Sequence, residues 1–390
     1  MIIFNSIKWL ARRASRDTSS GQFIAELDGL RFLAILSVFL FHLSAYVTEK
    51  SGRHPDSDLL AAFLSHGDIG VALFFIISGF VIALPYAKGH FFGSKIPELK
   101  QFFLRRLSRL EPPYFVNLLV FFCLMSLFTP NKAADMAPNL FASMMYLHTL
   151  IFSKASFINV VAWSLEVELQ FYLLAPFLTY LFAIRSLYLR RAILIGLILS
   201  FSLMNNLVSP LVSPVYALTL VCQAQYFFTG FLLLDVYLID WQQNPQLHGF
   251  WDTVSVASWC SIAGILFFWP SARVLIVLPM FVAYCAAFKG RISNRFFRHP
   301  FVYTVGGMCY TIYLYHYLII SSFGRLLVTS GVLFGLPLWG RIILSTVILA
   351  PITLLICTLL FIAIEKPCMK RDWYLRFINF KIPGVKAEIE

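Results

Sequence analysis

Ionisable side chains interrupt a strongly apolar stretch near the start of the chain. The run from Glu26 to Leu43 contains Asp28, Arg31 and His42 among residues that are otherwise apolar enough to enter a bilayer. Arg31 and His42 are separated by about 16 Å of helix, roughly half the hydrocarbon thickness. Ionisable groups at such depth are costly and mark candidate functional sites. A histidine there can act as a general base or as a nucleophile, and an arginine can bind an anion.

Two carboxylates enter a second apolar stretch, Trp163 to Leu174, which reads WSLEVELQFYLL. Glu166 and Glu168 are two residues apart, so they point to different sides of a helix. We expect Glu166 to lie nearer the outer interface, where water can reach it, and Glu168 to lie deeper, with Tyr172 one turn later on its face. A buried acid needs a partner. Glu168 is therefore either a catalytic group or a structural hydrogen-bond acceptor.

A late stretch combines a histidine with tyrosines. It reads GGMCYTIYLYHYLI and places Tyr310, Tyr313 and His316 at spacings of three. Such a histidine is often a satisfied core residue, and such tyrosines often form an interfacial belt. Counting residues from the predicted span ends, however, puts His42, Glu168 and His316 at nearly one level in the outer half of the bilayer. These three residues form the predicted catalytic set.

Three arginines precede the third apolar run, in the sequence FFLRRLSRLEPPY. Arg106 and Arg109 share a helix face, with Arg105 beside them. The planar guanidinium group suits a phosphate clamp, although positive-inside anchoring is the alternative. We expect the Pro112-Pro113 pair to end this helix and to hold the arginines at the membrane mouth.

The second apolar run contains the sequence FFIISGF, in which Ser78 and Gly79 interrupt aromatic residues near mid-membrane. Small residues let helices approach closely, which predicts helix packing. The functional alternative is that this gap admits part of a ligand.

Composition indicates the elements that carry these residues. Of 390 residues, 59% are hydrophobic and 13% are charged, and the mean hydropathy is +0.78. Soluble domains carry roughly a quarter of charged residues. The chain is therefore predicted to be an all-α polytopic membrane protein, a bundle of about ten transmembrane helices. The expected spans are 27–47, 68–87, 111–130, 161–182, 192–210, 215–239, 251–269, 273–288, 301–323 and 341–363.

The basic residues predict the orientation. Of the 31 Lys and Arg residues, 23 fall in alternate segments on one side of these spans and 7 fall on the other. By the positive-inside rule both termini are cytoplasmic. The expected organisation is a basic lead-in over 1–26, a ten-helix domain over 27–363 and a cytoplasmic tail over 364–390. This distribution also argues against nucleic-acid binding as the reason for the net charge of +12.

The seven cysteines predict no chemistry of their own. None forms a C-x-x-C pair or a zinc-ligand spacing, so we expect buried structural thiols and no metal site.

Taken in order, these motifs make the chain similar to the acyltransferase-3 family of integral membrane enzymes that acylate exported glycans. The matching features are the first-span arginine and histidine, FFxxSG, the basic motif before the third span, WSLxxExxFY, GxxxYxxYLxH and the closing IEKP. They fall on Arg31, His42, Ser78, Gly79, Arg106, Arg109, Trp163, Ser164, Glu168, Tyr172, Gly306, Tyr310, Tyr313, His316 and Ile364–Pro367.

The resemblance implies acetyl-CoA or a related acyl-CoA as cytoplasmic donor and no permanently bound cofactor. The acceptor would be a hydroxyl of an exported or lipid-linked saccharide, with membrane lipid as surroundings, in a bacterial inner membrane. His42 would be the general base or an acyl-carrying relay, with Glu168 orienting or charging it and His316 completing the set. Donor-binding residues would be Arg31, Arg106, Arg109, Ser78 and Gly79, supported by Trp163, Ser164, Tyr172, Tyr310 and Tyr313.

Two departures from the family pattern concern the second carboxylate and the chain length. Leu169 stands where many members have a second acid, and Glu166 stands where a small residue is common. Some members also carry an esterase-like domain after the membrane part, which we do not expect here.

Two rival interpretations come from the residues alone. A proton-coupled secondary transporter also uses intramembrane His, Glu and Arg, but the chain shows no related halves. A structural scaffold would not need aligned ionisable groups.

Overall fold

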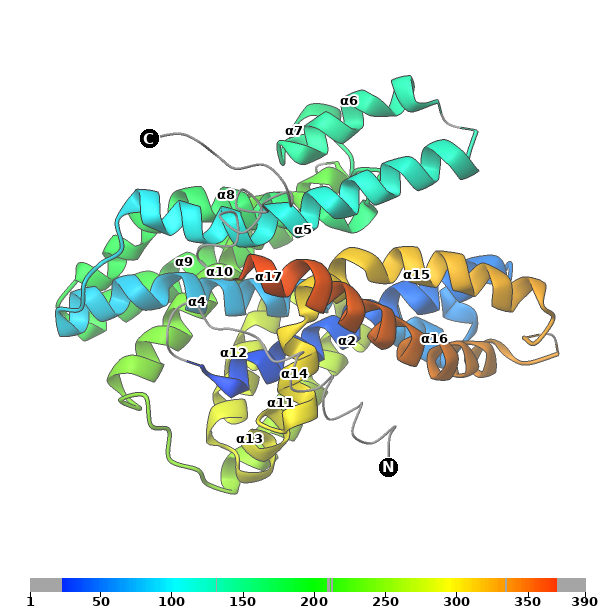
Figure 1. Cartoon of the computed structure of the whole chain (residues 1–390). Coiled ribbons are helices and arrows are strands. Elements are labelled where there is room, and N and C mark those ends of the chain that lie inside the picture. The colour runs from blue at the N-terminus through cyan, green and yellow to red at the C-terminus, as the bar shows by residue number, and fades with distance from the viewer. Residues whose placement is uncertain (1–22, 131, 209–210, 212, 334, 370–390) are drawn as a thin grey trace, which may run out of the picture.

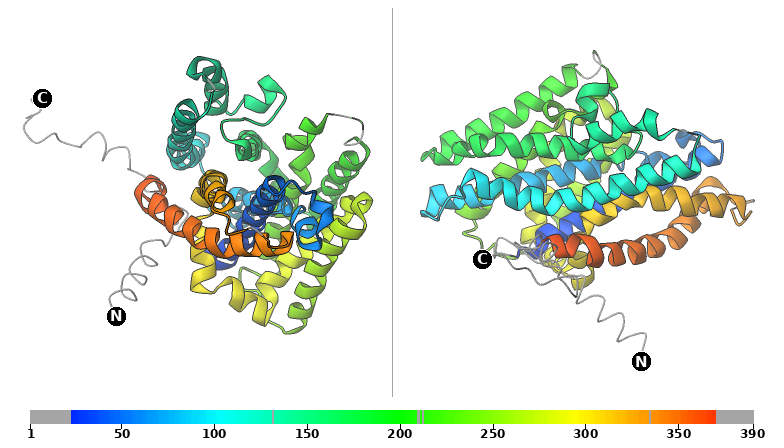
Figure 2. Two further views of the ribbon diagram at one scale, coloured as in Figure 1. Left: turned by 90° about the vertical axis from the view of Figure 1, so that its right-hand side faces the viewer. Right: turned by 45° about the horizontal axis from the view of Figure 1, so that its top comes forward.

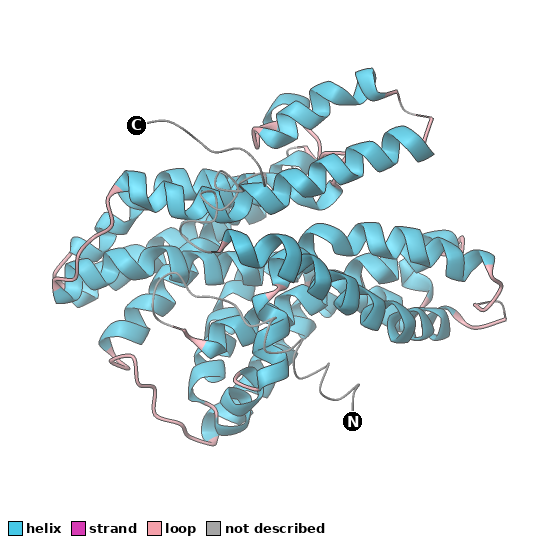
Figure 3. Cartoon of the chain, in the orientation of Figure 1, coloured by secondary structure: helices cyan, strands magenta, loops and turns pink. Residues whose placement is uncertain are grey.

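The computed structural model describes residues 23–130, 132–208, 211, 213–333 and 335–369, and these residues form helices and loops without strands (Figure 3). Within them, nine helical segments are long and apolar enough to cross a membrane, and they match nine of the ten predicted spans. The all-α polytopic architecture is thus confirmed. The segments are Ala25–Lys50, Leu59–Phe92, Leu99–Phe128, Val160–Ala183, Leu187–Val208, Leu220–Ile239, Phe250–Phe268, Pro270–Lys289 and Leu338–Cys368.

The remaining expected span, 301–323, is not one apolar helix. The chain there forms α14 (Pro300–Gly307) and α15 (Cys309–Thr329), which are separated at Met308. Gly306 packs against the backbone carbonyl of Asp28, so α14 crosses the first helix closely. The 21-residue α15 is not among the nine apolar segments, and it carries His316 and several tyrosines.

Helix α2 (Ala25–Lys50) lies inside the bundle. It packs against α4 (Ile69–Phe92), α14, α15 and α16 (Leu338–Leu360). Figure 2 (left) shows α2 in dark blue, surrounded by the other helices. The first-span residues therefore face protein on several sides rather than lipid.

The other helices complete the bundle in Figure 1, where α6 and α7 lie at its upper edge beside α5. They are α3 (Leu59–Leu64), α5 (Leu99–Phe128), α6 (Ala133–Met144), α7 (His148–Phe152), α8 (Trp163–Leu178), α9 (Leu187–Val208), α10 (Leu220–Ile239), α11 (Phe250–Phe268), α12 (Val277–Lys289), α13 (Arg291–Phe297) and α17 (Lys366–Cys368). A π-helical turn, Phe361–Glu365, joins α16 to α17.

A glycine pair lets α4 and α10 cross at close range. Gly79 packs against the backbone of Phe227, and Gly230 packs against the backbone of Ile76 and Phe80. Any side chain at either position would collide with backbone atoms. The expectation that Gly79 leaves a gap for ligand is therefore wrong, because α10 fills that gap.

The expectation that Pro112 and Pro113 end their helix is also wrong. Helix α5 runs unbroken from Leu99 to Phe128 with both prolines inside it. Within a membrane bundle, neighbouring groups can satisfy carbonyls that lose their helical donor. Pro112 and Pro113 leave the carbonyls of Ser108 and Arg109 without a helical donor. The hydroxyl of Tyr310 donates to the next carbonyl, that of Leu110, at 2.8 Å, and so connects α15 to α5 beside the prolines.

The loops that the charge distribution assigns to the same side of the membrane contact one another through ion pairs and hydrogen bonds. On one side, Arg191 bonds Asp240 at 2.7 Å. On the other, Arg273 bonds Asp68 at 3.0 Å and the Trp339 amide bonds Asp58 at 3.1 Å. The predicted lead-in and tail lie largely outside the described residues, which begin at residue 23 and end at residue 369.

Candidate active site

Two adjoining cavities share the same three arginines. Arg31 from α2 and Arg106 and Arg109 from α5 line both of them. The larger cavity, of about 320 Å³, has six basic lining residues and one acidic residue, Asp28. Its basic residues are Arg31, Lys88, Lys95, Arg105, Arg106 and Arg109. This cavity is a strongly cationic entrance to the smaller one.

The three arginines differ in their partners. Arg31 bonds the carboxylate of Asp28, one turn earlier on α2. Arg109 lies 3.9 Å from the buried carboxylate of Glu365. Arg106 has no carboxylate partner among the described residues, and its guanidinium donates to the Val81 carbonyl at 3.5 Å. Arg106 is therefore the guanidinium group most available to an anion from outside.

Glu168 projects into the smaller cavity. Its carboxylate accepts hydrogen bonds from the Ser78 hydroxyl at 2.7 Å and from the Tyr172 hydroxyl at 2.5 Å. The guanidinium carbon of Arg106 lies 5.7 Å from the Tyr172 ring. Ser78, Glu168 and Tyr172 thus form a hydrogen-bonded polar group in the same cavity as the three arginines. Two of the predicted donor-site features, Ser78 and the arginines, do share one cavity.

His42 and His316 are in direct contact. Nδ1 of His42 lies 3.1 Å from Nε2 of His316 and 3.0 Å from the Val38 carbonyl. Nδ1 of His316 lies 2.8 Å from the Tyr313 carbonyl and 3.0 Å from the Ile312 carbonyl. Because carbonyls only accept, each Nδ1 must carry the proton. His316 then accepts from His42 through Nε2, which leaves the Nε2 lone pair of His42 available as a base or nucleophile.

Glu168 does not join this pair. Among the described residues it shares no hydrogen bond with His42, and His42 does not line the cavity that holds Glu168. The α2 residue in that cavity is Arg31, which lies about 16 Å along the helix from His42. The expectation that Glu168 orients His42 is therefore wrong, and His316 has that position instead. Residue counting measured depth along each helix but could not show which side chains meet.

Helix α15 connects the two groups. Tyr313 lines the Glu168 cavity, and its hydroxyl lies 2.8 Å from the Ser164 hydroxyl and contacts the Val161 carbonyl. His316 follows Tyr313 by one turn on the same helix. The histidine pair therefore lies just beyond the end of the cavity at which Tyr313 and Ser164 meet.

The other predicted residues are placed as follows. Tyr310 lines the Glu168 cavity. Trp163 lines a different cavity. Glu166 is not solvated as expected: it is buried, and its carboxylate accepts the Thr149 amide at 2.9 Å. Thr149, which belongs to α7, thus covers Glu166 in the first turn of α8.

Sequence reasoning missed one acidic residue near the site. Glu365 is fully buried and accepts the amide of Thr311 at 3.1 Å and its hydroxyl at 2.6 Å. It also faces Arg109. The only signal was its place in the closing IEKP sequence, because a residue after the last apolar run gives no indication of burial.

Comparison with known proteins decides the family. The profile described as "Acyltransferase domain", of the acyltransferase-3 family, matches residues 24–362. The chain belongs to this family. Acyltransferase-3 membership and the apolar helices together make it an integral membrane protein. No solved structure matches it.

Two relatives of this acyltransferase-3 member come from Staphylococcus aureus. O-acetyltransferase OatA (strain NCTC 8325 / PS 47) is 30% identical over 166 residues, which are 40% of this chain and 25% of the relative. The protein named "Putative O-acetyltransferase SACOL0978" (strain COL) is 26% identical over 333 residues, which are 77% of this chain and 51% of the relative. The chain thus spans between a quarter and about half of the length of these curated relatives.

Proposed function

We propose that this protein transfers an acyl group, most simply acetyl, from cytoplasmic acyl-CoA to a hydroxyl of an exported or lipid-linked saccharide. One observation carries the proposal: the cationic entrance leads to the cavity of Glu168, next to a histidine with an available nitrogen lone pair. Family membership and relatives named as O-acetyltransferases support acyl transfer to oxygen. We also propose a bacterial inner-membrane location with both termini in the cytoplasm.

The phosphates of the donor would bind at the cationic entrance, and its extended pantetheine arm would carry the thioester inward toward His42. Coenzyme A carries several negative charges, and guanidinium groups bind phosphate oxygens through strong, paired hydrogen bonds. Arg106 is the best placed of the three arginines, because Arg31 and Arg109 already face carboxylates. Coenzyme A is a substrate in this scheme, and no permanently bound cofactor is required.

His42 would remove the proton from the acceptor hydroxyl. The hydroxyl oxygen attacks the thioester carbonyl, an ester C–O bond forms, and the C–S bond breaks. The proton passes to Nε2 of His42 and from there to the departing thiolate. His316 holds the protonated Nδ1 of His42 and stabilises the imidazolium formed during the transfer. In the relay form, Nε2 of His42 first takes the acyl group and then passes it to the hydroxyl.

Replacement of single arginines tests the donor site. We expect Arg106→Ala to weaken acyl-CoA binding by about 1.5–3 kcal/mol, the scale of a hydrogen bond to a charged group. Calorimetric titration of the purified protein with acyl-CoA measures this loss. Arg106→Ala should weaken the binding of dephosphorylated donor analogues less than it weakens the binding of the intact donor.

Arg325→Ala is the matched control, since Arg325 is exposed at the far end of α15. Equal losses for intact and dephosphorylated donors would show that Arg106 acts only as a topological anchor. If the protein moved a solute across the membrane and formed no ester product, a proton-coupled secondary transporter would be favoured over an acyltransferase.

A further inference from the structure

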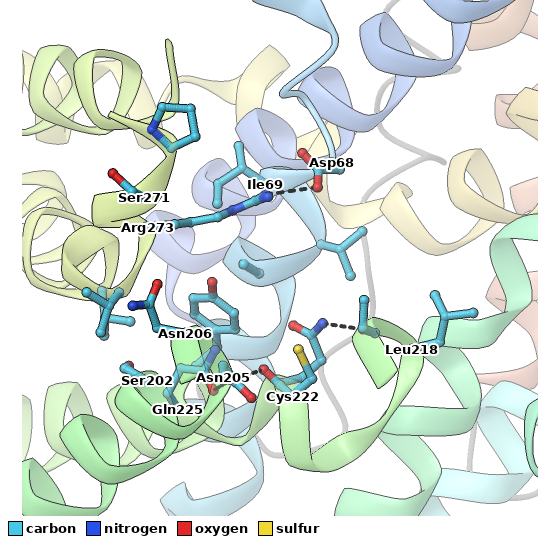
Figure 4. Close-up of a pocket in the computed structure, with 18 of the residues that line it drawn as sticks. Asp68, Ile69, Ser202, Asn205, Asn206, Leu218, Cys222, Gln225, Ser271 and Arg273 are labelled. Carbon is cyan, nitrogen blue, oxygen red and sulfur yellow. Dashed lines mark hydrogen bonds and ion pairs between the residues drawn. The ribbon is translucent and has the colours of Figure 1, made fainter. Parts of the chain in front are cut away.

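A third cavity lies at the opposite end of α4 from the arginines. It has a volume of about 490 Å³, and residues from the starts of α4 and α8 and from α9 and α10 line it (Figure 4). The three cavities follow one another along α4. Residues 68–72 line this one, residues 74–82 line the Glu168 cavity, and residues 81–88 line the cationic entrance.

The lining of this cavity is polar but electrically balanced. Asp68 and Arg273 are the only charged lining residues in the described part of the chain, and they pair at 3.0 Å. Most of the remaining polar groups are carboxamides and hydroxyls, those of Ser202, Asn205, Asn206, Gln223, Gln225, Tyr226 and Ser271. Figure 4 shows Ser202, Asn205, Asn206, Gln225 and Ser271 among them. An anionic ligand would find no uncompensated positive charge among these residues.

Several of these groups are positioned in advance. Asn205 donates to the Cys222 carbonyl at 2.7 Å and to Gln225 at 2.9 Å, and it accepts from Tyr216 at 2.6 Å. The hydroxyl of Ser202 is buried and has no hydrogen-bond partner among the described residues. A buried hydroxyl without a partner is costly unless a ligand or water satisfies it.

We propose that this cavity binds an uncharged saccharide unit of the acceptor, a proposal that rests on the proposed function. Saccharide hydroxyls both donate and accept hydrogen bonds, as carboxamides and hydroxyls do. Trp163 and Tyr226 add aromatic surface, against which the apolar faces of a sugar ring can pack. The balanced charge separates this site from the cationic donor entrance.

The position of the cavity fits an acceptor site. Gly67, which precedes Asp68 in the chain, packs against the side chain of Phe41, the neighbour of His42. On the other side, Trp163 precedes Ser164, which contacts Tyr313 one turn before His316. The charge distribution also places Asp68 and Arg273 on the side opposite the donor. Acceptor and donor would thus approach the histidine pair from opposite ends of α4.

Protection of an introduced cysteine tests binding directly. Ser271 is exposed at the cavity, so Ser271→Cys should react with a membrane-impermeant maleimide. Cys123, Cys222, Cys260 and Cys309 are at least partly exposed, so each is replaced by alanine in the background protein. With chitotetraose at ten times its Kd, the labelling rate should fall about tenfold. Ser330→Cys, exposed in the loop after α15, is the control whose labelling should not change.

The outcomes separate the site from the proposed function. Protection by chitotetraose but not by tetragalacturonate supports the site. Equal protection by the charged sugar, or protection by neither, overturns it. If chitotetraose protects the cysteine but receives no acyl group, the site is supported and the proposed function is contradicted. If chitotetraose receives an acyl group but does not protect the cysteine, the proposed function is supported and the site is contradicted.

Steady-state kinetics give a second readout. Asn206→Ala should raise KM for chitotetraose about fivefold, the effect of one lost hydrogen bond, and leave KM for acyl-CoA unchanged. Asn206 makes no hydrogen bond within the described residues, so its loss should not unfold the protein. Asn244→Ala, exposed in the loop after α10, is the matched control. A change in KM for acyl-CoA alone would overturn the assignment.

Discussion

At the scale of single residues, the proposed chemistry depends on one nitrogen lone pair, that of Nε2 in His42. Its availability follows from two hydrogen-bonding steps, because backbone carbonyls fix the proton of His316 and His316 fixes the proton of His42. We expect His42→Ala to lower the rate of acyl transfer about 100- to 10,000-fold, the usual range for loss of a general base. Product formation under saturating acyl-CoA measures the rate.

Donor binding is the internal control for His42→Ala, since His42 does not line the cavity of the arginines. The affinity for acyl-CoA should therefore be retained. Activity within a few-fold of the unmodified protein would remove His42 from the mechanism. His316→Gln keeps a hydrogen-bond acceptor beside His42, so it should retain more activity than His316→Leu if His316 acts as a positioning residue.

Sequence reasoning identified both histidines but not their relation. It assigned the supporting role to Glu168, because acidic groups commonly orient a histidine and residue counting gave the two equal depth. The structure shows that His316 lies beside His42 and that Glu168 bonds Ser78 and Tyr172. Position along a helix can be counted from sequence, whereas the rotation and neighbours of that helix depend on packing that no single run of residues encodes.

At the scale of helices, the length of the apolar runs predicted the membrane spans correctly, whereas prolines did not predict where a helix ends. Nine expected spans coincide with helical segments because the bilayer thickness fixes their length. The prolines of α5 failed as a stop signal because tertiary contacts hold the helix together around them. The carboxamides at Asn205 and Gln225 were visible inside apolar runs, and they could have indicated the third cavity.

The crossing of α4 and α10 gives a stability prediction. Gly230→Ala would place a methyl group among backbone atoms of α4, including the amide nitrogen of Phe80 at 2.7 Å. We expect it to destabilise the fold by about 1–3 kcal/mol, the usual cost of overpacking. Thermal unfolding of the purified protein in detergent, followed by tryptophan fluorescence, measures the change.

Gly196→Ala is the matched control for the crossing. Gly196 lies within α9, and an added Cβ would meet nothing within 4 Å. The control should be neutral or stabilising by about 0.5–1 kcal/mol, because alanine loses less backbone entropy in a helix. If both variants have the same unfolding temperature, the close approach of α4 and α10 does not contribute to stability.

At the scale of the whole molecule, the three cavities along α4 predict opposite entry of donor and acceptor. The cationic entrance includes Lys88, Lys95 and Arg105, from the segment that the charge distribution places in the cytoplasm. The polar cavity includes Asp68 and Arg273, from the opposite side. The acyl group would then cross the membrane while coenzyme A stays in the cytoplasm.

Proteoliposomes of known orientation test this arrangement. Acyl-CoA is confined to one side and a soluble saccharide acceptor to the other, and ester product is measured by mass spectrometry. We expect product only when acyl-CoA faces the side of the termini, because only that side presents the arginines. From the other face, phosphates would have to pass the carboxylate of Glu168, which lines the same cavity as Arg106 and would repel them. Product formed solely with both substrates on the side of the termini would overturn the model of opposed entry, and the saccharide would then be acylated before its export.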